Sequence, residues 1–312
     1  MTRRHPFIRG LLVTVAAITA LVSGAPLAAA APRSGGVQPN IVGGQNATQS
    51  WTVSLQSVHP EGPLHECGGT LIAPQWVMTA AHCAPYIAGQ ARIGSTNWKM
   101  GGEINTVSQI FVNPEHDSSK NFGNDIALVK LVKPSKIQPV PIGIAKPAGS
   151  AGLAQGWGIT CDVDVTAPGC GDQVPDLLQQ LAMSRASASI GGDHHCDLTN
   201  AAGVQLNDTT TMMCLVTTDG SRAGICFGDS GSPYLQTFKD RNNQDVKAVS
   251  GIIIALMNNT VATPHVCSQT PTGDANRDAA TNVSTQLPWI IDTLTEHDYA
   301  AAAYVQSHLL TN

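Results

Sequence analysis

Beyond residue 40 the sequence lacks two features: an apolar run long enough to cross a bilayer, and an excess of basic residues. A membrane-spanning helix needs about 20 mostly apolar residues, so we expect no later segment to span a membrane. Four of the 17 basic residues precede Ile41, which leaves 13 against 22 acidic residues and a formal charge of about −9. This balance argues against nucleic acid or an anionic membrane surface as a partner.

The sequence also lacks a group of residues at metal-ligand spacing. His194-His195-Cys196 comes nearest, but no second cysteine or histidine lies at ligand spacing beside it. We therefore expect no metal and no cofactor. The eight cysteines, an even number behind an export signal, indicate disulfides instead. Eight cysteines allow 105 pairings, so spacing alone does not choose among them.

The first 30 residues have the layout of a secretory signal peptide. Three arginines precede the apolar run 11–22, and small residues follow up to Ala30. An uncleaved membrane anchor is the alternative, but Gly24 and Pro26 interrupt the helix that an anchor needs. We expect cleavage near Ala30, a secreted extracellular protein and no stable membrane association afterwards. The alanine-rich signal also suggests a bacterial source.

From Ile41 onward the sequence alternates between short β-branched runs and turn residues, which predicts an all-β sandwich or a pair of barrels. Helical periodicity occurs only near the end, where apolar residues recur at steps of three or four. Prolines cluster between residues 132 and 151, as in a linker, and no internal repeat is visible. The expected strands lie at 51–56, 70–72, 76–79, 126–132 and 246–256.

Four separated segments supply the parts of one chemistry. Gly228-Asp229-Ser230-Gly231-Ser232-Pro233 offers a serine, Thr79-Ala80-Ala81-His82-Cys83 a base, and Asn124-Asp125-Ile126-Ala127-Leu128 a carboxylate. A serine hydroxyl is a poor nucleophile until a base accepts its proton and donors receive the oxyanion. The fourth segment is Ile41-Val42-Gly43-Gly44.

Along the chain these residues run in the order His82, Asp125, Ser230, and with these flanks the chain resembles the chymotrypsin/trypsin family of serine endopeptidases. An α/β-hydrolase runs in the order Ser, Asp, His and needs a Gly-x-Ser-x-Gly turn, which is absent here. The resemblance implies Ser230 as nucleophile, His82 as base and Asp125 as orienting carboxylate. It also implies that the N–H groups of Gly228 and Ser230 form the oxyanion hole.

The same resemblance implies a fold of two six-stranded antiparallel β-barrels followed by a C-terminal α-helix. We place the signal peptide at 1–30, an activation propeptide at 31–40 and the protease domain at 41–312. Within that domain the first barrel would cover about 41–140, the second about 150–285 and the helix about 286–310.

The resemblance further implies activation by cleavage before Ile41, whose new amino group would pair with Asp229. The family's usual basic residue before the cut is replaced by Asn40, so we expect a non-tryptic activator. The implied disulfides are Cys67 with Cys83, Cys226 with Cys267, and Cys196 with Cys214. Cys161 and Cys170 then remain to form the fourth bond.

The specificity pocket departs most from the family. Gly224, six residues before Ser230, stands where trypsin-like members carry an aspartate, so the usual route to Arg/Lys preference is absent. Asp278 would lie on the opposite wall and could offer a carboxylate; otherwise it is a surface residue. Ile254-Ala255-Leu256 replaces the family's Ser-Trp-Gly. Leu256 would then narrow the pocket and favour small or medium apolar side chains, or the loop would run differently.

These features predict a secreted, monomeric serine endopeptidase that acts on peptides or proteins and is made as a zymogen. Because residues 254–256 lack the family's Ser-Trp-Gly, an alternative stays open. In that alternative, the chain is a secreted protease homologue that binds proteins without cleaving them.

Overall fold

The computed structural model describes the backbone of these residues: 41, 43–117, 123–160, 174–186, 208, 210–218, 223–256, 267 and 277–311. The side chains of residues 255, 256 and 277 are not described. The expected signal peptide and activation propeptide therefore lie outside the described residues, as do Cys161, Cys170 and Cys196.

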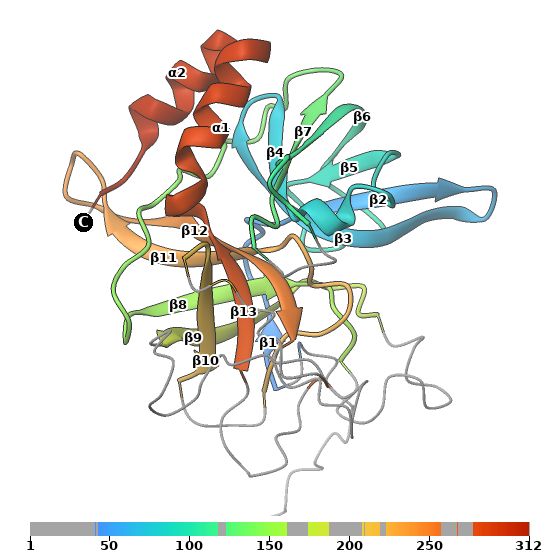
Figure 1. Ribbon diagram of the computed structural model, residues 1–312. Coiled ribbons are helices and arrows are strands. Elements are labelled where there is room, and N and C mark those ends of the chain that lie inside the picture. Colours follow the sequence, from blue (N-terminus) through green and yellow to red (C-terminus); the bar gives the residue numbers. More distant parts are fainter. Residues whose placement is uncertain are drawn as a thin grey trace, which may run out of the picture. The chain divides into compact units, whose positions relative to one another are not determined.

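The first barrel closes with the strand order β2-β3-β4-β7-β6-β5, and every pairing within it is antiparallel (Figure 1). Closure leaves no unpaired edge and directs alternate side chains inward. The short 3-10 helix η1 (Ala81–Cys83) follows β4. The strands are β2 (Val53–His59), β3 (Gly62–Ala73), β4 (Trp76–Thr79), β5 (Gln90–Ile93), β6 (Glu103–Val112) and β7 (Ala127–Leu131).

The second barrel closes through the order β9-β10-β13-β12-β11-β8, with β8 pairing back to β9. The short strand β1 (Gln45–Asn46) adds to β9. The fold prediction of two six-stranded antiparallel barrels is confirmed. The strands are β8 (Ala151–Gly156), β9 (Gln179–Ala186), β10 (Met212–Thr217), β11 (Pro233–Lys239), β12 (Asp245–Leu256) and β13 (Arg277–Asn282).

The C-terminal segment forms two helices, where the sequence predicted one over about 286–310. Helix α1 (Val283–His297) begins three residues earlier than expected, and α2 (Tyr299–His308) follows it. Asp298 separates them because its backbone is not helical (φ −168°, ψ 82°). Its carboxylate caps α2 at the N–H of Ala301 and accepts a hydrogen bond from Trp76 Nε1 at 2.9 Å.

The bond to Asp298 places the start of α2 beside Trp76, which is buried like the other residues of β4. The predicted apolar stripe is buried at Ile290, Leu294, Ala301 and Val305. Among the described residues, no helix combines the length and the apolar character that crossing a membrane requires.

Candidate active site

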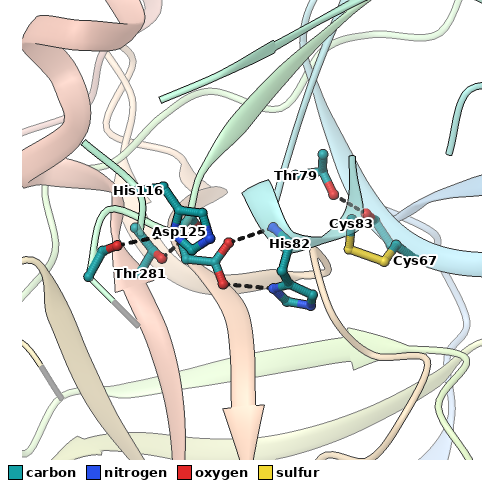
Figure 2. A network of polar contacts seen from close by, with 9 residues as sticks. Cys67, Thr79, His82, Cys83, His116, Asp125 and Thr281 are labelled. Carbon is teal, nitrogen blue, oxygen red and sulfur yellow. Dashed lines mark hydrogen bonds and ion pairs between the residues drawn. A yellow bond between two sulfur atoms is a disulfide. The ribbon is translucent and has the colours of Figure 1, made fainter. Parts of the chain in front are cut away.

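His82 and Asp125 form a close pair in the first barrel. His82 lies in η1 and Asp125 immediately before β7. His82 Nδ1 lies 2.7 Å from Asp125 Oδ2, and the His82 N–H donates to Asp125 Oδ1 at 3.0 Å (Figure 2). Asp125 is fully buried, whereas the His82 side chain is 33% exposed. The Asp125 carboxylate therefore holds the His82 ring in one orientation. Nε2 of His82 has no hydrogen bond among the described residues.

Ser230 lies on a tight turn between Cys226 and β11. The N–H of Asp229 donates to Cys226 O and the N–H of Ser232 donates to Asp229 O, both at 3.0 Å. The N–H of Gly231 donates to Ile253 O at 2.8 Å, which ties the turn to β12. These bonds define the backbone on both sides of Ser230.

One short segment of β3 anchors both His82 and Ser230. Cys83, the neighbour of His82, is disulfide-bonded to Cys67 (Figure 2). The next residue, Gly68, donates its N–H to Ser230 O at 2.7 Å. The histidine of the first barrel and the serine of the second are thus both connected to residues 67–68.

Gly228 has a left-handed backbone (φ +96°), which a residue with a Cβ rarely adopts. Within the described part of the chain, the N–H groups of Gly228 and Ser230 have no acceptor. Two unpaired donors beside a serine match what an oxyanion hole requires.

His65 was missed from the sequence, where no motif surrounds it. Its Nε2 donates to Gly228 O at 3.0 Å, and its Nδ1 lies 2.8 Å from Ser54 Oγ. Burial lowers the pKa of His65 to about 4, although the bond to Gly228 opposes that shift. The ring is therefore neutral at pH 7 and can hold the Gly228 carbonyl only through this one tautomer.

The carboxylate of Asp229 is fully buried and fully bonded. Oδ1 accepts from the Gly158 N–H at 2.7 Å and Oδ2 from the Cys226 N–H at 2.8 Å. A Cβ on Gly158 would lie 2.2 Å from Oδ2, which explains why glycine is needed there. Burial raises the pKa of Asp229 to about 7 despite these two donors. The side chain of Ile41 is also buried, in a cluster that includes Ala223 and Ile225.

The expected pocket residues Gly224 and Asp278 are both buried. Asp278 Oδ2 accepts from the Ile225 N–H at 3.1 Å, but Oδ1 has no partner among the described residues. Burial raises the pKa of Asp278 well above its usual value, and the charge of Asp229 adds to this. The surface-loop alternative for Asp278 is wrong. Leu256 pairs with Asp278 through the backbone of β12 and β13, and its side chain lies outside the described residues.

Ile254 occupies the position at which the resemblance predicts a serine bonded to Asp125. The register of β12 against β13 shifts between Ile253 and Ala255, so Ile254 is the extra residue. Its buried side chain belongs to the hydrophobic cluster that the first barrel shares with β12 and α1. Within the described residues, the Asp125 carboxylate has partners only on His82.

The disulfides Cys67–Cys83 and Cys226–Cys267 are present as expected. Cys214 is also disulfide-bonded. Cys67, Cys83 and His82 place possible metal-ligand atoms within 4.8 Å of one another. The two sulfurs are bonded to each other, however, and a disulfide offers no thiolate ligand.

Comparison with known proteins agrees with this geometry. The family model described as Trypsin matches residues 41–290. Mouse tryptase is 33% identical over 250 residues, which cover 74% of this chain and 84% of the tryptase. Dog serine protease 1 is 36% identical over 62% of this chain and 74% of its own length. Drosophila melanogaster trypsin alpha is 32% identical over 62% of this chain and 72% of its own. The chain therefore belongs to the trypsin family of chymotrypsin-like serine endopeptidases.

Proposed function

We propose that this chain is a secreted endopeptidase that hydrolyses peptide bonds through Ser230, His82 and Asp125. Ser230 attacks the peptide carbonyl, His82 takes the serine proton and later gives it to the leaving amine, and Asp125 stabilises the imidazolium. The N–H groups of Gly228 and Ser230 receive the oxyanion. The observation that carries the proposal is the common anchor at Cys67-Gly68, which is bonded to the neighbour of His82 and to Ser230 itself.

The precursor would be activated by cleavage between Asn40 and Ile41. A buried carboxylate without a counter-charge is unfavourable, and Asp229 already has a raised pKa. A free Ile41 amine has a pKa of about 8 and supplies the missing cation at neutral pH. Pairing the two would hold the Gly228–Ser230 turn in its working conformation. Asn40 implies an activating protease that does not require a basic residue.

For the substrate, we propose side chains with a positive charge before the scissile bond. Gly224 offers no carboxylate, but Asp278 has a buried oxygen that meets no partner among the described residues, beside the segment that leads to Ser230. A lysine or arginine side chain would pair with that oxygen and offset the cost of burying it. Asp278 would thus perform from β13 the task that the family usually gives to residue 224.

Labelling with a fluorophosphonate tests the nucleophile. The activated wild type should be labelled and should cleave peptides, whereas Ser230→Ala should do neither. Ser232→Ala is the matched control, because the Ser232 hydroxyl is buried two residues away and has no hydrogen-bond partner in the part of the chain that the structure describes. Equal labelling of Ser230→Ala would disprove the assignment. Labelling of the wild type without cleavage of any peptide in a diverse library would instead favour a binding protein.

A further inference from the structure

The carboxylate of Asp125 has protein partners only on His82 within the described residues, and Ile254 offers it no hydroxyl. Its position must therefore come from its backbone. Thr281 Oγ1 donates to the carbonyl of Asp125 at 2.8 Å, and both residues are fully buried (Figure 2). The remaining restraints lie on the residues before and after it.

Asn124 has a left-handed backbone (φ +50°), which is uncommon outside glycine and persists only where the surroundings hold it. Its Oδ1 accepts from Gln286 Nε2 at 2.9 Å. Its own N–H lies 3.3 Å from Thr211 Oγ1, and its carbonyl accepts from the Ile126 N–H at 2.8 Å. Gln286 thus holds the side chain of the residue that sets the direction of Asp125.

Gln286 lies in the first turn of α1 and is 2% exposed. Its Oε1 accepts from Asn113 Nδ2 at 2.9 Å, which leaves its Nε2 directed to Asn124. Asn113 in turn donates its N–H to Ile126 O at 3.1 Å. The two buried amides therefore connect the C-terminal helix to both neighbours of Asp125, residues 124 and 126.

We propose that Gln286 is a positioning residue for catalysis, which holds Asn124 in its left-handed conformation and thereby keeps Asp125 aligned on His82. The proposal rests on the function proposed above, in which Asp125 orients the base. Small misplacements of a catalytic group lower the turnover rate with little effect on substrate binding. Gln286 thus performs through the backbone a task that a hydroxyl at position 254 cannot perform here.

The test is Gln286→Met in the activated enzyme, which keeps the length of the side chain and removes the hydrogen bonds of its amide group, including those to Asn113 and Asn124. We expect kcat to fall about 10-fold to 100-fold with KM unchanged. The acid limb of the kcat/KM profile should move to lower pH, because a displaced carboxylate stabilises the imidazolium less. Asn105→Leu is the matched control: this buried amide contacts Lys133 and not the Asp125 loop. It should lose stability without moving the pH profile.

Asn124→Gly distinguishes a positioning role of Gln286 from a general role in stability. Glycine adopts φ +50° without a side-chain hydrogen bond to hold it there. If Gln286 acts through Asn124, Gln286→Met should cost little further activity in that background. An equal loss in both backgrounds would overturn the proposal. Asn124→Ala, which leaves α1 intact and removes the acceptor, provides the same test if Gln286→Met does not fold.

Asp125→Asn distinguishes the two proposals. An inactive Asp125→Asn enzyme together with a Gln286→Met enzyme that behaves like Asn105→Leu would overturn only the role of Gln286. A fully active Asp125→Asn enzyme would overturn the triad and the positioning role together.

Discussion

Asp229 and Asp278 are both fully buried carboxyl groups near the segment that carries Ser230, yet their surroundings differ. Asp229 has a backbone donor on each oxygen, from Gly158 and Cys226. Asp278 has one donor, from Ile225, and its second oxygen has no partner among the described residues. A satisfied buried group serves the fold, whereas an unsatisfied one is unfavourable until a ligand reaches it. We propose a role in activation for Asp229, whose buried charge its two backbone donors do not balance, and a role in substrate selection for Asp278.

Replacing Asp229 should have the largest effect. Asp229→Asn removes the partner of the Ile41 amine, so the turn that holds both oxyanion donors should lose its order. Loss of one such donor costs on the order of 10²–10³ in rate, so we expect at least a 10³-fold fall in kcat/KM for every substrate. Steady-state assays on the cleaved protein measure this, with amino-terminal sequencing to establish that Ile41 is free. Full activity in Asp229→Asn would show that the carboxylate plays no part in activation.

Replacing Asp278 should instead change which substrates are cleaved. Asp278→Asn keeps the shape of the side chain and removes its charge, so peptides with Arg or Lys before the scissile bond should lose on the order of 10²–10³ in kcat/KM. Matched peptides with norleucine at that position should change little, which controls for damage to the catalytic groups. A wild type that prefers apolar residues, with Asp278→Asn unchanged, would contradict the role of Asp278 and favour Gly224 as an open pocket floor.

The smallest effect should come from replacing His65. Its Nε2 donates to the carbonyl of Gly228, the residue before Asp229. The pKa of His65 is about 4 in the folded protein and near 6.5 when exposed, so the unfolded chain binds the proton more readily. His65 should therefore lower the free energy of unfolding by about 3 kcal/mol as the pH drops from 6.5 to 4, whereas the raised pKa values of Asp229 and Asp278 act in the opposite direction. Urea titrations across this range measure it.

His65→Gln, which keeps a donor for Gly228, removes only the His65 contribution, so the free energy of unfolding of the variant should rise relative to that of the wild type by about 3 kcal/mol between pH 6.5 and 4. His59→Gln is the matched control, because His59 is exposed at the end of β2 and its replacement should leave the slope unchanged. A difference in stability between the wild type and His65→Gln that stays constant from pH 6.5 to 4 would contradict the lowered pKa of His65.

The sequence predicts the positions of strands better than it predicts the break between the two C-terminal helices. The strands at 76–79 and 246–256 follow from short β-branched runs and lie within a residue of their observed bounds. The helix was predicted from its apolar spacing, but its break at Asp298 was not. That break depends on a carboxylate that contacts Trp76, more than 200 residues away, and no local pattern records such a contact.

The sequence by itself determined the family and the order of His82, Asp125 and Ser230 along the chain, because these depend on residue types carried by short motifs, and the resemblance to that family implied the disulfides Cys67–Cys83 and Cys226–Cys267. It left open whether Asp278 lies at the surface or in the pocket, because an irregular loop separates that residue from the motifs. Only the tertiary structure decided that Asp278 is buried, and it alone revealed the hydrogen bonds of His65 to Gly228 and of Gln286 to Asn124. Their contacts join segments more than 50 residues apart, and burial, which gives these polar groups their energetic weight, exists only once the barrels close.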